Sequence, residues 1–87
     1  MIDPNFTRVC FNVRCLTSLG EQVYVVGNHP ILGDWDAMMA VRMKTSRDNY
    51  PIWSVDVELP RGAKIEYKFI KRLTQKTGNT EVTWEAL

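Results

Sequence analysis

The sequence has little of the chemistry on which most enzymes depend. Its 87 residues include 1 histidine and 2 cysteines, and 11 basic against 10 acidic residues leave a net charge of +1. The histidine, His29, precedes a proline, has no nucleophile or metal ligand at a suggestive spacing, and is expected to be a solvent-exposed loop residue. No phosphate-binding, dinucleotide-binding or nucleophile-elbow motif is present. These absences predict a protein with no catalytic residues, no metal and no cofactor.

Three further absences restrict the partners and the compartment. No apolar run approaches the ~18 residues that a membrane-spanning helix needs, so no membrane partner is expected. The balanced charge disfavours a partner held mainly through phosphates. Residues 1–6 lack the basic start and apolar stretch of a signal peptide, which favours the cytoplasm if Met1 is the native start.

The two cysteines are expected to stay unbridged. Cys10 and Cys15 lie in one extended stretch at an odd separation, which places their side chains on opposite faces of a strand. We therefore expect two free thiols.

The apolar residues recur with a period of two, which is typical of half-buried strands. In the clearest segment, 53–59, the side chains of Trp53, Val55 and Val57 alternate with polar ones. Further strands are predicted at 7–15, 22–26, 65–71 and 81–84, with a short one around 41–43 and a possible helical turn at 36–39. Short strands separated by glycine- and proline-containing turns predict an all-β, antiparallel β-sandwich.

The chain ends directly after a strand-like segment, at Ala86 and Leu87. We therefore expect one domain, residues 1–87, excised from a larger protein. Such a sandwich could lack its last strand and leave an edge free for pairing.

Large aromatic rings stand in polar surroundings where nothing obliges them to be buried. Trp35 lies between Asp34 and Asp36, Trp84 is near the chain end, and Tyr50 follows a polar loop. Paired carboxylates can cleave glycosides, but two aspartates within one short loop more commonly form turn hydrogen bonds. Exposed flat rings suit either the apolar face of a sugar or an unpaired nucleic-acid base.

Five blocks of sequence, in the right order, carry a resemblance to a known family. They are GEQVYVVGN at 20–28 with LGDWD at 32–36, YPIWSVDV at 50–57, LPRG at 59–62, IEYKFIK at 65–71 and VTWE at 82–85. From Val9 onward the chain resembles the family 20 starch-binding domains, which are carbohydrate-binding modules.

The resemblance implies an immunoglobulin-like sandwich that binds α-1,4-glucans such as starch, amylopectin or glycogen without cutting them. It implies a first site in which the rings of Trp35 and Trp84 cradle a curved glucan while Lys68 and Glu85 supply hydrogen bonds. The chain ends before the position of an asparagine that usually completes this site in the family.

The resemblance also implies a second site, and it places Trp53 in the framework. The second site consists of Leu19, Gln22 and Tyr50, where Gln22 replaces an asparagine found in some relatives. The expected partners are an α-glucan or malto-oligosaccharide and a covalently linked enzyme domain that the module targets to the polysaccharide.

Two other functions remain open from the residues themselves. The aromatic and basic residues could bind single-stranded nucleic acid, although the carboxylates of Asp34, Asp36, Glu66 and Glu85 beside the same rings disfavour it. The chain could also be a degenerate module used for protein contacts.

Overall fold

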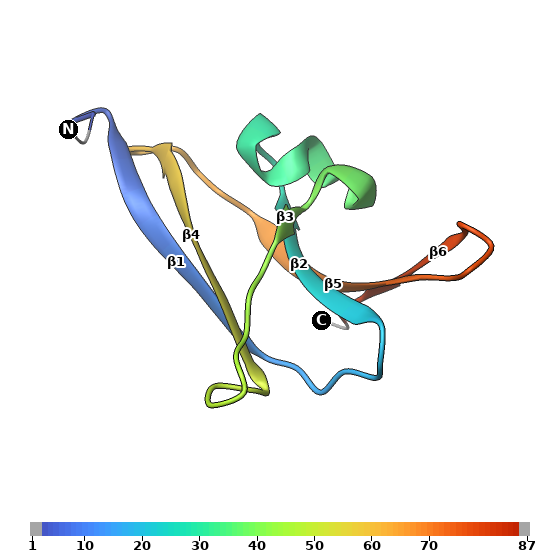
Figure 1. Ribbon diagram of the computed structural model, residues 1–87. Coiled ribbons are helices and arrows are strands. Elements are labelled where there is room, and N and C mark those ends of the chain that lie inside the picture. The colour runs from blue at the N-terminus through green and yellow to red at the C-terminus, as the bar shows by residue number, and fades with distance from the viewer. Residues whose placement is uncertain (1–2, 86–87) are drawn as a thin grey trace.

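The strands of this protein form two antiparallel sheets, as the computed structural model shows for residues 3–85 (Figure 1). One sheet pairs β1 (Phe6–Arg14) with β4 (Ile52–Pro60). The other has the order β3-β2-β5-β6, built from Val41–Arg42, Glu21–Gly27, Tyr67–Thr74 and Thr80–Trp84. The all-β antiparallel prediction is confirmed, and every predicted strand is present.

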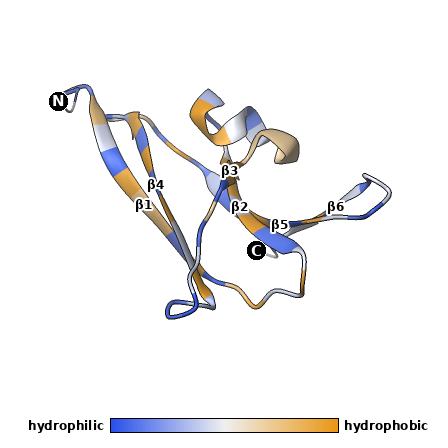
Figure 2. Ribbon diagram, in the orientation of Figure 1, coloured by the Kyte–Doolittle hydropathy of each residue, from blue (hydrophilic) through white to orange (hydrophobic). Residues whose placement is uncertain are grey.

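The register of β1 and β4 explains why the alternation of apolar and polar residues predicted these two strands correctly. Phe11 pairs with Val55 and Val13 with Trp53, so apolar residues of both strands share the face that meets the second sheet. Arg8, Asn12 and Arg14 lie on the other face, and Figure 2 shows blue segments between orange ones along β1.

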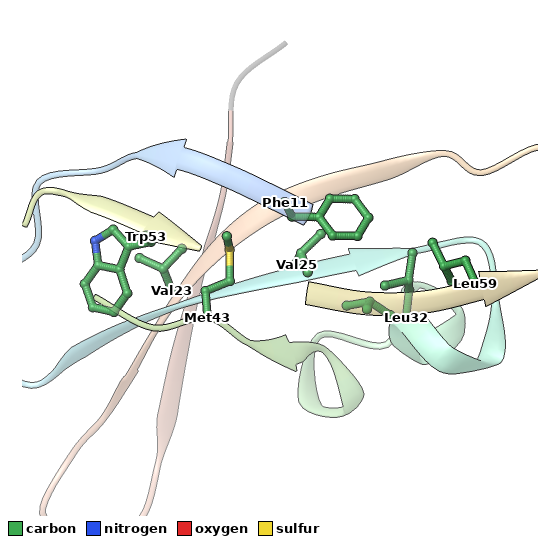
Figure 3. Packing of buried hydrophobic residues seen from close by; sticks show 8 residues of the cluster. Phe11, Val23, Val25, Leu32, Met43, Trp53 and Leu59 are labelled. Carbon is green, nitrogen blue, oxygen red and sulfur yellow. The ribbon is translucent and has the colours of Figure 1, made fainter. Parts of the chain in front are cut away.

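The core lies between the two sheets. Trp53, Phe11 and Leu59 from the first sheet meet Val23 and Val25 from β2, all of them buried (Figure 3). The indole Nε1 of Trp53 donates a hydrogen bond of 3.0 Å to the carbonyl of Cys15, so the buried ring has its polar atom satisfied. The prediction that Trp53 is a core residue is confirmed.

β1 has no strand partner on its second edge within residues 3–85. The far edge of β4, in contrast, is bridged between Ser54 and Lys44. The expected absence of a last strand remains a prediction, and Ala86 and Leu87 lie outside the described residues. Cys10 is exposed on β1 while Cys15 packs against the core, and both are free thiols, as predicted.

Two short 3₁₀ helices, η1 (Pro30–Trp35) and η2 (Ala37–Met39), connect β2 to β3 and lie over one end of these strands (Figure 1). The sequence predicted the second as a turn and the first as a loop. The Asp36 carboxylate accepts a hydrogen bond of 2.9 Å from the Met38 amide, which confirms its turn role. His29 is half-buried rather than exposed, and its Nδ1 accepts a hydrogen bond of 3.1 Å from the Ile31 amide.

Candidate functional site

Trp35 is held outward by an unusual run of backbone. Gly33, Asp34 and Trp35 have φ angles of 85°, 49° and 67°, and the Trp35 side chain is 39% exposed. A positive φ costs a residue with a Cβ atom about 1–2 kcal/mol, and it is a clear outlier for a ring as large as indole. Such strain concentrates at functional positions, where the surrounding structure maintains it.

The surrounding structure here is the anchor that Leu32 provides. The Leu32 side chain is 0% exposed and belongs to the main core, so η1 is fixed to the sandwich one turn before Trp35. Gly33 sits against the backbone of Met39, at a distance that leaves no room for a Cβ atom. The loop is therefore rigid, and its exposed indole loses little freedom when a ligand binds.

Lys68 and Trp84 share one face of the four-stranded sheet. We call this the outer face, because it lies opposite the core residues Val23 and Val25. Trp84 pairs with Ile70, and Lys68 is two residues from Ile70 on the same strand. Trp84 is 42% exposed and lies beside the buried Ile70, whereas Lys68 is half-buried.

The structure thus brings Lys68 and Trp84 together and places Trp35 near the same sheet. Trp35 is linked to this sheet through its own element, because η1 packs against β2 and β2 is hydrogen-bonded to β5.

Glu85 is tied to the neighbouring strand. Its carboxylate Oε1 accepts a hydrogen bond of 2.8 Å from the Phe69 amide, and its own amide donates to the Phe69 carbonyl at 3.1 Å. The side chain therefore secures the end of β6 and the adjoining Trp84, and its second oxygen remains available to a ligand.

Tyr50 is joined to the loop that carries Leu19. Its hydroxyl accepts a hydrogen bond of 2.9 Å from the Thr17 amide and donates one of 3.2 Å to the Thr17 carbonyl. The hydrogen bond with the Thr17 hydroxyl, followed by that with its amide, lowers the pKa of Tyr50 below its usual range. Leu19 is fully exposed and Tyr50 is 41% exposed, so both predicted members of this second site lie at the surface.

Gln22 is more constrained than the other predicted residues. Its amide nitrogen donates hydrogen bonds to the carbonyls of Met43, at 2.6 Å, and Val23, at 3.2 Å. Only the amide oxygen is left for a ligand, so the nitrogen acts as a clamp between β2 and the segment after β3.

One contact on the outer face was missed from the sequence. The Arg72 guanidinium lies 4.1 Å from the centre of the Tyr24 ring, which is a cation–π arrangement. The period of two in the sequence indicates that Tyr24 lies on this face, because Gln22 and Tyr24 alternate with the buried Val23 and Val25 and so belong to the opposite face.

Residues 3–85 contain no group of three or more histidine, cysteine, aspartate or glutamate side chains placed to hold a metal ion. Over the same range, no helix is long and apolar enough to cross a bilayer.

A β-sandwich that displays partly exposed tryptophans at its surface, one of them near a lysine, has the form of a non-catalytic carbohydrate-binding module. The comparison with known families agrees: residues 6–87 match the starch-binding domain family, and the chain belongs to it.

Individual relatives support the same family. The chain is 41% identical over 78 residues to glucoamylase-1 of Schizophyllum commune, covering 90% of this chain and 12% of that protein. It is 44% identical over 72 residues to a cyclomaltodextrin glucanotransferase of Geobacillus stearothermophilus, covering 80% of this chain and 10% of that protein. The chain therefore spans about one-tenth of the length of these relatives.

Solved structures show the same fold. The family 20 module of a maltotetraose-forming amylase from Pseudomonas saccharophila has a TM-score of 0.77 and 32% identity, covering 93% of this chain and 82% of that chain. A glucoamylase from Hypocrea jecorina has a TM-score of 0.81 and 35% identity, covering 97% of this chain and 14% of that chain. Nothing in these comparisons supports the nucleic-acid alternative.

Proposed function

We propose that this module holds a curved α-1,4-glucan at a first site formed by Trp35, Lys68, Trp84 and Glu85. The observation that carries the proposal is the Trp35 loop, in which a partly exposed indole is kept at a φ of 67°. Strained residues of this kind cluster at ligand sites, and the apolar face of a sugar ring fits a partly exposed indole.

The chemistry of the two rings favours a helical glucan over a flat one. Indole faces set at an angle can both contact a chain only if the chain bends between them. The Lys68 ammonium donates hydrogen bonds and the free oxygen of Glu85 accepts them, as the hydroxyls at the sugar edge require. The contacts are shallow and hydrated, so we expect a Kd for a short malto-oligosaccharide of about 1 μM to 1 mM.

A second, weaker site is proposed at Leu19, Gln22 and Tyr50. The hydrogen bonds between Tyr50 and Thr17 support it, because they fix the ring beside the loop that carries Leu19. The engagement of the Gln22 amide nitrogen by Met43 leaves this site with fewer polar contacts than the first.

The role proposed for the module is to target an enzyme to polysaccharide. Residues 1–87 would form one domain linked covalently to a catalytic domain. The relatives named above support this, since each is an enzyme many times longer than the matching segment.

The first site is tested by calorimetry of Trp35→Ala with maltoheptaose. We expect the variant to lose most of the binding of the unmodified protein, because one face of the cradle is removed. A matched control is Ile52→Ala, which truncates a side chain of similar exposure, 41%, on the other sheet. Full retention of binding by Trp35→Ala would remove the assignment of the first site.

A further inference from the structure

The outer face of the four-stranded sheet carries cations without a matching set of carboxylates. The ladder registers place Arg42, Lys68 and Arg72 on it, together with Tyr24 and Trp84. The remaining members of the same ladder positions are neutral: Gln22, Val26, Ile70, Thr74, Thr80 and Val82.

The opposite face of the same sheet is different. There Glu21 lies 3.7 Å from Lys71, so the lysine is paired. Within residues 3–85, no carboxylate lies within ion-pair distance of Arg42, Lys68 or Arg72. Within that part of the chain, the three outer-face cations are therefore available to an anion.

These cations lie next to the proposed first site. Trp84, Ile70, Tyr24 and Arg42 are successive partners in one row across the strands. With strands about 4.8 Å apart, Tyr24 lies about 10 Å from Trp84 and Arg42 about 14 Å away. This is the scale of a few sugar units, so a glucan that continues past Trp84 along the row approaches the two arginines.

Arg72 is already oriented by the protein. Its guanidinium stacks on Tyr24 at 4.1 Å, and its Nε is buried with no hydrogen-bond partner within residues 3–85. The stacking fixes the plane of a group whose remaining N–H donors match a phosphate oxygen pair. Among residues 3–85, no ion pair joins Asp34 or Asp36 to Arg42 or Arg72.

We propose that the outer face recognises α-glucans carrying phosphate monoesters, with Trp84 contacting sugar and Arg72 and Arg42 contacting the phosphate. The proposal rests on the proposed function and adds a substrate class to it. It is compatible with the net charge of +1, because a phosphate monoester on a neutral polymer needs a local pair of cations rather than a basic protein.

The test compares maltoheptaose with a maltoheptaose that carries a single phosphate monoester, by calorimetry with the complete chain. We expect the phosphorylated ligand to bind about threefold to tenfold more tightly, the range of a charge-assisted hydrogen bond at a partly exposed site. This preference should shrink when the salt is raised from about 0.15 M to about 1 M, where screening shortens the Debye length from ~8 Å to ~3 Å.

Two variants localise the effect. Arg42→Gln and Arg72→Gln should each reduce the preference for the phosphorylated ligand. Each variant should keep its affinity for unmodified maltoheptaose within about twofold, because a twofold change in Kd corresponds to very little binding free energy. Arg8→Gln, which removes an exposed cation from β1 on the other sheet, should preserve the preference. A circular dichroism melt checks that Arg72→Gln is folded, since that residue also packs on Tyr24.

The outcomes separate the two proposals. Equal affinity for the two ligands, with maltoheptaose bound, overturns the phosphate inference and leaves the proposed function standing. Absence of binding to both ligands overturns both. Equal binding of inorganic phosphate and the phosphorylated glucan overturns the inference as well, because the sugar would then contribute nothing.

Discussion

Replacing Gly33 with alanine tests how the protein holds Trp35 in place. Gly33 has a φ of 85°, and a Cβ atom there would lie 2.7 Å from the Met39 carbonyl oxygen and 2.8 Å from its carbon. The backbone conformation costs alanine about 1–2 kcal/mol. The contact adds about 1–3 kcal/mol, because backbone atoms rather than a flexible side chain must move. The expected loss of unfolding free energy is therefore about 2–5 kcal/mol.

Gly62→Ala is a matched control. Gly62 has a φ of 82°, but nothing lies within 4 Å of the position of its Cβ. The Gly62→Ala variant should lose only the unfolding free energy that the left-handed backbone conformation costs alanine, about 1–2 kcal/mol. With a urea m-value of about 1 kcal/mol per M, the Gly33→Ala midpoint should lie at least about 1 M below that of Gly62→Ala.

The same pair of variants connects stability to binding. The Met39 backbone can relieve the contact only if η1 and η2 separate, and that movement carries Trp35 away from its position. Under conditions where both variants are folded, Gly33→Ala should bind maltoheptaose more weakly than Gly62→Ala. Equal destabilisation of the two proteins, or equal binding by both, would refute the idea that close packing at Gly33 positions the tryptophan.

Three other predictions follow from single features of the structure. Trp35→Gly should be more stable than Trp35→Ala by roughly 1 kcal/mol in urea unfolding, because glycine tolerates the φ of 67°; the opposite order, usual for an ordinary position, would contradict the strained loop. Cys10 should react with iodoacetamide before Cys15, as peptide mass spectrometry would show, because Cys10 is exposed while burial raises the pKa of the Cys15 thiol; a faster Cys15 would contradict this. Thr17→Val should raise the pKa of Tyr50 in an NMR titration, because it removes the hydroxyl that favours the phenolate; an unchanged pKa would exclude that hydrogen bond as the cause.

The lowered pKa of Tyr50 also fixes the direction of a stability change. A group whose pKa is lowered by folding stabilises the folded state when it is ionised. The stabilisation of the folded state that comes from ionising Tyr50 is therefore fully present above the ordinary tyrosine pKa. It is lost as the pH falls through the lowered pKa.

The strands were predictable because their signal is local. Each apolar residue of β4, from Trp53 to Leu59, faces the core at every second position, and a period of two survives whatever the strand pairs with. The order of strands was not predictable in the same way. β2 pairs with β5 rather than with β4, and nothing in either segment alone specifies that long-range choice.

The Trp35 loop shows where sequence reasoning ends. Glycine at position 33 is a normal indication of a positive φ, but Asp34 and Trp35 continue the left-handed conformation without one. Their conformation follows from the anchoring of Leu32 and the packing against Met39, which are tertiary contacts. The position of Trp84 beside Lys68 required the register of β5 and β6, while the resemblance supplied only the candidate residues.

The central claim is that Trp35 and Trp84 grip one glucan together. A double-mutant cycle with Trp35→Ala, Trp84→Ala and the combined variant, titrated with maltoheptaose, tests it most directly. Cooperation predicts that each single variant loses most of the binding and that the double variant loses little more. Fully additive losses, or a single variant that binds as well as the unmodified protein, would contradict cooperative binding of one glucan by the two indoles.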